Sequence, residues 1–335
     1  MDQSKIEALR KKYSERSIEQ VDNPEFKKAI PEISELYHGL RTLVDAPFQQ
    51  RLEGLDIALI GVPFDLGITH RPGARFGPKG IRDMSMIVGP YNHQTAVNPF
   101  ALCNIADVGD VNLHGFDLDA GIAQIEEYYH KVKDAGVSAV SAGGDHSITY
   151  PIMKALGRDE PVGMIHVDAH CDTMGSFGDS KFHHGGPFRN AVLAGVLDPD
   201  RCVQIGIRGP AEVFWEFSYE SGMTVLPIQE VNALGMAAVI EKAREVVGDG
   251  PTYVTFDVDG LDPVFTPGTG TPEIGGLSTR EALQLLRGLR GLNIIGGDLV
   301  EVAPEYDQTS NTVQVGKQML FEILCLTGES LAARR

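Results

Sequence analysis

The chain has 335 residues, a length that suits one large α/β domain or two small ones. Hydrophobic residues make up 42% of it and charged residues 22%, which is typical of a soluble globular protein. The formal net charge of -17 argues against nucleic acid as a partner, because a phosphate backbone is bound by basic surfaces.

The cysteines and the apolar runs indicate the cellular compartment of the protein. Four cysteines lie far apart and form no CxxC pair, which favours a reducing compartment and argues against a disulfide framework or a structural zinc site. No apolar run reaches membrane-spanning length, and no charged-then-apolar signal opens the chain. We therefore expect a cytoplasmic protein with no membrane partner.

The N-terminal part differs from the rest of the chain. Residues 1–51 are charged and carry one short helical pattern, at residues 6–13. We expect them to form an arm that packs over the domain or against a neighbouring subunit. Residues 52–335 contain no repeat, linker or low-complexity tract, so we expect a single domain there.

Beyond the arm, apolar runs alternate with helical patterns. The expected strands are residues 55–62, 103–108, 137–140, 162–167, 202–207, 223–228, 253–258 and 292–302. The expected helices are one beginning near residue 78 and those at 117–135, 148–156, 187–195, 237–247, 278–290 and 315–332. Such alternation predicts a parallel sheet that is covered by helices on both faces.

A loop rich in glycine and proline follows the first expected strand. Loops at the carboxyl ends of strands often carry binding residues, and Asp65, Arg71 and Arg75 are the candidates here. A buried arginine–aspartate pair that only supports the loop is an equal alternative.

The stretch IHVDAHCDT, residues 165–173, places three metal-ligand side chains at the end of an apolar run. In an extended backbone, Asp168, His170 and Asp172 point to one face, at the end of a strand where open α/β sheets place their chemistry. Cys171 turns to the opposite face, and we expect it to pack in the core. An ordinary solvated loop is the alternative for this stretch alone.

Two further strand ends carry the same residue types. Asp257 and Asp259 follow the run at residues 253–256, and His146 follows the run at residues 137–140. Four carboxylates at one place repel one another unless cations lie among them, and two dications balance four aspartates. An oxygen-rich set with two imidazoles and no thiolate favours Mn²⁺ over zinc, with Ni²⁺ as the alternative. Two adjacent dications can lower the pKa of a shared water and so supply a nucleophile for hydrolysis.

The motifs GGDH, DAHCD and FDVDGLDP, in this order and spacing, resemble those of the ureohydrolase family of arginases, agmatinases and guanidino-acid hydrolases. The resemblance spans roughly residues 55–326. The stretches THRPGARFGP, HHGGPFR, IGIRG and GTGTPEIGG look closest to the guanidinobutyrase, guanidinopropionase and agmatinase branch. The resemblance implies a three-layer α/β/α fold with a mainly parallel sheet of about eight strands. It also implies a homo-oligomer, trimeric or hexameric, and hydrolysis of a guanidinium group to urea and an amine.

The resemblance also implies a role for each residue of the site. Its two Mn²⁺ ions would be held by His146, Asp168, His170, Asp172, Asp257 and Asp259. Asp168 and Asp257 would bridge the two ions. His184 would help to deliver a proton to the leaving amine, and Asp259 would relay a proton from the attacking water. Glu301 would hold the guanidinium group of the substrate, as a carboxylate can do with two hydrogen bonds.

The sequence does not determine which chemical group the guanidino substrate carries at its far end. A carboxylated tail, as in 4-guanidinobutanoate or 3-guanidinopropanoate, needs a basic partner, for which Lys181, Arg75 and Arg208 are candidates. Agmatine would need an acidic pocket mouth, and guanidine or a small substituted guanidine only a closed pocket. Glu273 is a weaker candidate for guanidinium binding.

Three other functions fit the sequence less well. A non-catalytic subunit of a hetero-oligomer would be expected to lack some ligands, and all six are present. A deacetylase-like amide hydrolase with a single zinc ion needs fewer carboxylates. A two-metal phosphoesterase would need a basic phosphate cradle or a P-loop, which the sequence lacks.

Overall fold

A single parallel sheet forms the centre of the molecule. The computed structural model describes residues 2–16, 39–85, 90–209 and 212–335. The sheet has eight strands in the order β2-β1-β3-β8-β7-β4-β5-β6, and every neighbouring pair is parallel. The strands are β1 Ile57–Gly61, β2 Ile105–Asp110, β3 Ser138–Ala142, β4 Val162–Val167, β5 Leu197–Ile207, β6 Thr224–Pro227, β7 Thr252–Asp257 and β8 Ile294–Val300. The predicted α/β fold with about eight strands is thus confirmed.

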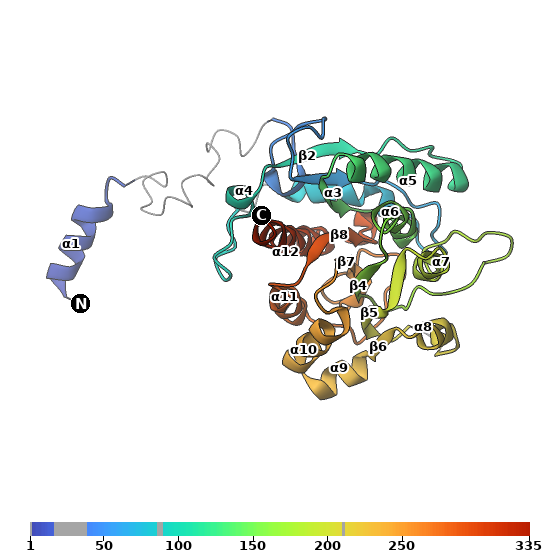
Figure 1. The fold of residues 1–335 in the computed structure, drawn as a ribbon. Helices are drawn as coiled ribbons and strands as arrows, with labels where there is room; N and C mark the ends of the chain where they lie inside the picture. The colour runs from blue at the N-terminus through green and yellow to red at the C-terminus, as the bar shows by residue number, and fades with distance from the viewer. Residues whose placement is uncertain (1, 17–38, 86–89, 210–211) are drawn as a thin grey trace.

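Helices cover both faces of the sheet (Figure 1). On one face lie α3 Gly77–Met84, α9 Ile228–Leu234, α10 Met236–Val247, α11 Thr279–Gly288 and α12 Asn311–Ala333. On the other face lie α5 Leu118–Asp134, α6 Thr149–Leu156 and α7 Pro187–Leu193. Two hydrophobic cores result, and β1 contributes Ile57 and Leu59 to one and Ala58 and Ile60 to the other. Burial on both faces explains why this strand is an unbroken apolar run.

Most predicted elements are present, with shifted ends. The capping box of Ser278 and Glu281 begins α11 as predicted. The sequence missed the short helices α4 Pro99–Leu102, α8 Glu216–Ser221 and α9, and β5 begins five residues earlier than predicted. Helix α1, Gln3–Tyr13, buries none of its residues. Residues 43–46 of the predicted arm pack over the domain, with Leu43, Val44 and Ala46 buried in one of its two cores. Residues 17–38 lie outside the described residues, so the packing of the rest of the arm stays a prediction. Within the described ranges, no helix combines the length and the apolar character needed to span a membrane.

The strand order determines where the candidate residues meet. Strands β3, β8, β7 and β4 are neighbours at the centre of the sheet, and all run in the same direction. Their carboxyl ends therefore lie side by side, where parallel sheets place ligands. The turn after β3 needs glycine, because a Cβ atom on Gly144 would lie 1.6 Å from the carbonyl oxygen of Phe64.

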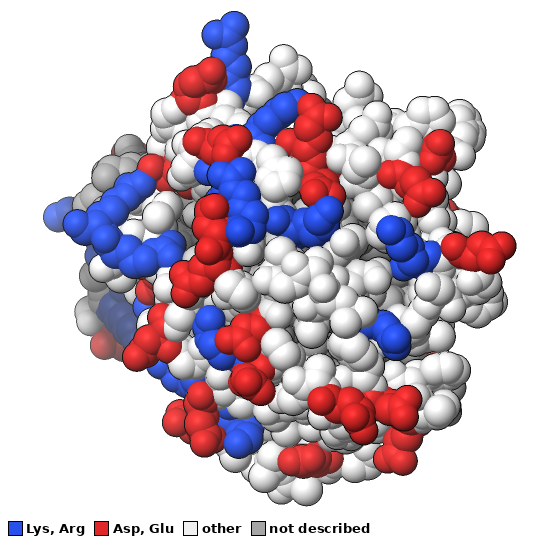
Figure 2. Space-filling model, turned by 45° about the vertical axis from the view of Figure 1, so that its right-hand side comes forward, with Lys and Arg blue, Asp and Glu red and all other residues white. Residues whose placement is uncertain are grey.

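The surface shows no continuous basic face in the view of Figure 2, where lysine and arginine side chains are interspersed with acidic ones. A phosphate backbone would find no uninterrupted basic track on that face.

Candidate metal centre

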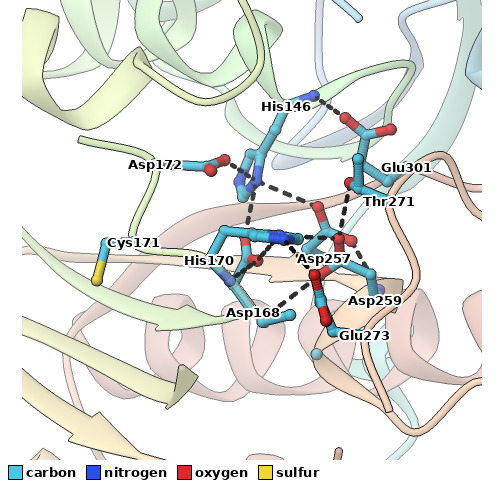
Figure 3. A network of polar contacts seen from close by, with 12 residues as sticks. His146, Asp168, His170, Cys171, Asp172, Asp257, Asp259, Thr271, Glu273 and Glu301 are labelled. Atoms are coloured by element: carbon cyan, nitrogen blue, oxygen red, sulfur yellow. Dashed lines mark hydrogen bonds and ion pairs between the residues drawn. The ribbon is translucent and has the colours of Figure 1, made fainter. Parts of the chain in front are cut away.

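Three carboxylates surround one imidazole nitrogen at the first part of the site. The Nδ1 atom of His146 lies 3.0 Å from Asp168 Oδ2, 3.0 Å from Asp172 Oδ2 and 3.4 Å from Asp257 Oδ2 (Figure 3). All four side chains are buried. The predicted ligands at the ends of β3, β4 and β7 thus converge, although His146, Asp168 and Asp257 are 22 to 111 residues apart in the chain.

A second group adjoins the first. The Nδ1 atom of His170 lies 3.2 Å from Asp259 Oδ2 and 3.4 Å from Asp168 Oδ1. Asp168 directs one carboxylate oxygen to each group, because its Oδ2 atom faces His146. It is therefore the residue that joins the two halves of the site.

The site fits divalent metal ions. The buried Nδ1 atom of His146 has no hydrogen-bond partner, although three carboxylates lie around it. A single proton on this nitrogen cannot serve three carboxylates, whereas a cation among them can bind all four groups at once. Two sets of ligand atoms lie close enough to share an ion each: His146, His166, Asp168 and Asp172, and Asp168, His170 and Asp259.

The backbone does not place the ligands in the way that strand alternation predicted. Strand β4 ends at Val167, so Asp168 to Asp172 lie in a turn beyond it. Asp172 adopts a left-handed conformation with φ of 51°. The three side chains converge because the chain turns, and the prediction of an extended backbone here was wrong. Cys171 nevertheless points away from the cluster, as predicted, and packs with Ile207 (Figure 3).

A buried histidine that the sequence analysis missed supports Asp168. The Nε2 atom of His166 lies 2.7 Å from Asp168 Oδ2, and its Nδ1 atom lies 3.1 Å from the side-chain nitrogen of Gln204. Since the side-chain nitrogen of Gln204 can only donate to Nδ1, the Nε2 proton of His166 is directed at Asp168. Neither ring nitrogen of His166 then has a lone pair free for a metal ion, so His166 supports a ligand and is not one of the ligands. His166 lies in β4 within an apolar run, so only its neighbours in space reveal this role.

The other nitrogen of His146 is also held. Its Nε2 atom lies 2.8 Å from the hydroxyl of Thr255. Behind it, buried Asp298 accepts hydrogen bonds from Thr149 and Tyr253, at 2.8 and 3.1 Å. A histidine ligand whose second nitrogen donates to an oxygen keeps its orientation and its metal-binding tautomer.

The six candidate ligands together form what we call the cage. Glu301 and His184 form a pair beside it. Glu301 follows β8 and is fully buried, in a left-handed conformation with φ of 64°. Its Oε1 atom accepts hydrogen bonds from the backbone N–H of His146 at 2.9 Å and from His184 Nδ1 at 3.1 Å. Its buried Oε2 atom has no partner. The Nε2 atom of His184 lies 2.6 Å from the hydroxyl of Thr69.

The profile of the arginase family matches residues 55–326. The chain belongs to the arginase family. Guanidinopropionase of Pseudomonas aeruginosa is 47% identical to it over 88% of this chain and 94% of that protein. The mitochondrial agmatinase of Gallus gallus is 47% identical over 86% of each chain. The solved structure of proclavaminate amidino hydrolase from Streptomyces clavuligerus has a TM-score of 0.85 and 36% identity, over 88% of this chain and 99% of that one.

The arginase-family fold places a pocket of about 490 Å³ above the cage. Asp172, His170 and His184 line it, together with apolar side chains that include Met174 and Trp215. Lys181, one of the three candidate partners for a substrate carboxylate, is not among the lining residues and lies against the ring of Phe182.

Arg75 and Arg208, the two arginines that were candidates for binding a substrate carboxylate, also bond to other groups of the protein. Arg75 forms an ion pair with buried Asp65, whose carboxylate also accepts a hydrogen bond from the backbone N–H of Gly73 at 2.8 Å. The arginine–aspartate pair of the alternative is therefore present, with the aspartate buried and the arginine 38% exposed. Arg208 donates to the backbone carbonyls of Gly206, Asp259, Gly260, Leu261 and Glu273. It braces the turn that carries Asp259 and has no N–H group left for a substrate.

Protons should compete with metal ions at this arginase-family site. Burial, with the charge of Asp168, raises the pKa of Asp259 to about 6. Burial opposes the imidazolium form of His146, but the nearby carboxylates of Asp168 and Asp172, which stabilise that form, outweigh burial and raise the pKa of His146 well above its usual value. Both groups hold protons more tightly than usual, and metal binding must displace those protons.

We therefore expect the metal affinity to fall by about tenfold for each pH unit below 7.5, because His146 holds its proton over this range. Below about pH 6 the fall should steepen, because Asp259 also takes up a proton there. Titrating metal-free protein with Mn²⁺ at pH 5.5, 6.5 and 7.5 measures the effect. An affinity that stays constant over this range would show that these groups carry no proton to displace.

Proposed function

We propose that the protein hydrolyses the guanidinium group of a small guanidino acid, such as 4-guanidinobutanoate or 3-guanidinopropanoate, to urea and an amine. The observation that carries this proposal is the buried Oε2 atom of Glu301, which lacks a partner beside the metal cage. A planar guanidinium group is the donor that such an orphaned carboxylate oxygen accepts well. The names of the guanidinopropionase and agmatinase relatives support the same reaction class.

We propose two Mn²⁺ ions as cofactors, held by His146, Asp168, His170, Asp172, Asp257 and Asp259. Six ligands of oxygen and imidazole type, with no thiolate among them, favour Mn²⁺, and Ni²⁺ is the alternative. When bound, the ions would lower the pKa of a water and so supply the nucleophile for hydrolysis.

The residues of the chain supply the remaining steps. Glu301 orients the guanidinium carbon over the cage through Oε2, and Asp259 takes up the proton of the attacking water at Oδ2. Burial disfavours the charged form of His184, but the hydrogen bond and charge of Glu301 outweigh it and raise the pKa of His184 to about 9. His184 therefore carries a proton at neutral pH, and it can pass this proton from Nε2 through the hydroxyl of Thr69 to the leaving amine.

We further propose that the chain forms a homo-oligomer, a trimer or a hexamer, in the cytoplasm. Val264 and Ile274, in the segment beside the pocket, are 70% and 87% exposed, which favours their burial against another subunit. The four cysteines are all unpaired and buried, as suits a reducing compartment.

The experiment that tests the proposed function is a urea assay. Protein loaded with Mn²⁺ or Ni²⁺ is incubated with 4-guanidinobutanoate, 3-guanidinopropanoate, agmatine, arginine and guanidine. We expect urea from at least one of the two guanidino acids. Urea from agmatine alone would support agmatinase activity instead, and no urea from any compound with either metal would overturn the hydrolase proposal.

A further inference from the structure

Only one lysine or arginine among the described residues lines the pocket, and it is Arg71. The other basic side chains of the region are engaged elsewhere: Arg75 with Asp65, Arg208 with backbone carbonyls, and Lys181 outside the pocket. Apart from the protonated His184, which contacts Glu301, Arg71 is therefore the basic side chain of the pocket that can meet an anionic substrate tail.

Arg71 is held in place without a carboxylate. Its guanidinium group lies over the ring of Tyr306, with Cζ 5.4 Å from the ring centre. The hydroxyl of Tyr306 donates to the carbonyl oxygen of Pro72 at 2.9 Å, which anchors the ring beside the loop. Within the described part of the chain, Arg71 makes no ion pair with Asp or Glu. Stacking on an aromatic face orients a guanidinium group and leaves its N–H groups available at the edge.

The position of Arg71 in the loop suits the far end of a substrate. Thr69, two residues before it, contacts His184, and His184 contacts Glu301. A substrate whose guanidinium group lies on Glu301 can therefore extend along the pocket towards Arg71. Met174 and Trp215 line the pocket and offer apolar surface to a short methylene chain.

We propose that Arg71 binds the carboxylate of the substrate and so selects guanidino acids over guanidino amines. This inference rests on the proposed function, and it names the residue that reads the substrate tail. An arginine and a carboxylate form two charge-assisted hydrogen bonds in one plane, whereas the ammonium group of agmatine would be repelled by Arg71.

One carboxylate of the pocket would favour guanidino amines over guanidino acids. Glu273 also lines the pocket, and an ammonium tail would be attracted to it. Its Oε1 atom, however, lies 3.8 Å from Nε2 of His170, a candidate metal ligand. Glu273 is thus placed at the metal side of the pocket, where the guanidinium end lies, and we assign the tail to Arg71.

The test compares three variants on three substrates. Arg71→Ala removes the charge and the stacking, and Arg71→Lys keeps a charge without the two parallel hydrogen bonds. Lys181→Ala is the matched control, because it removes a nearby positive charge from outside the pocket. The value of kcat/KM is measured with 4-guanidinobutanoate, 3-guanidinopropanoate and agmatine, on metal-loaded protein whose folding is checked by circular dichroism.

For Arg71→Ala we expect kcat/KM to fall by about 10- to 100-fold with the guanidino acids and to stay level or rise with agmatine. Arg71→Lys should retain part of the preference for guanidino acids. If the alanine variant does not fold, the lysine variant still tests the proposal. Lys181→Ala should leave the preference unchanged.

Three results would overturn the assignment of Arg71. The first is an equal loss on acids and agmatine in both Arg71 variants, and the second is an unchanged preference in both. The third is a wild-type protein that releases urea from agmatine and not from the acids. In each case, urea release by the wild-type protein would still support the ureohydrolase reaction. A failure of the Arg71 proposal can therefore be distinguished from a failure of the proposed function.

Discussion

Asp168→Ala should remove metal binding and turnover together. Asp168 directs Oδ2 to the His146 group and Oδ1 to the His170 group, so its loss takes a ligand from both halves of the cage. Replacing even a residue that only supports a ligand costs about 10- to 100-fold in metal affinity, and we expect more than 100-fold here. Urea release should fall to the background rate. Metal content by mass spectrometry and urea release measure the two effects on one sample.

The matched control for this variant is Asp179→Ala. Asp179 is an exposed aspartate in the loop between Asp172 and His184, outside the pocket lining, and its removal also lowers the negative charge by one. The Asp179→Ala variant should retain two metal ions per chain and full activity. If Asp168→Ala held two ions as tightly as the wild-type protein, Asp168 would not be the residue that joins the two groups.

His184→Ala should leave the metals in place and lose most of the activity. His184 contacts Glu301 and Thr69, and none of the six candidate ligands bonds to its side chain. A general acid contributes about 10²- to 10⁴-fold to a rate, so kcat should fall within that range. We expect added imidazole to restore part of the activity, because imidazole, which is partly protonated near neutral pH, can occupy the space of the missing ring and donate a proton.

His93→Ala serves as the control for this variant, since His93 is exposed and lies outside the pocket lining. Loss of metal from His184→Ala would contradict the assigned role, because it would make His184 a support of the cage. Full activity in His184→Ala would exclude it as the proton donor. Recovery with imidazole distinguishes a lost proton donor from a distorted site.

The parts of the site that could be predicted from the sequence are those that follow strand ends within short motifs. His146 and Asp168 each come within four residues of the end of a strand, and Asp257 is the last residue of a strand. The carboxyl ends of parallel strands meet at one edge of the sheet. The fold could be predicted for a related reason, since a strand buried on both faces, such as β1, leaves an unbroken apolar run.

What could not be predicted depends on contacts between segments that are distant in the sequence. His166 lies in β4 and looks like a core position until Gln204 of the neighbouring strand is placed beside it. Asp172 reaches the cage through a left-handed turn, which a period of two residues cannot indicate. Among the arginines, only the fold separates Arg75, which is paired with Asp65, from Arg71, which faces the pocket.

The most direct test of the central claim is the number of metal ions that the cage holds. Metal-free protein at pH 7.5 is titrated with Mn²⁺ by calorimetry, and the bound metal is counted after removal of the excess. Four converging carboxylates and the orphaned nitrogen of His146 predict two ions per chain at saturation. A single ion per chain at saturating Mn²⁺ and Ni²⁺, or none, would contradict the two-metal site on which the proposed hydrolysis depends.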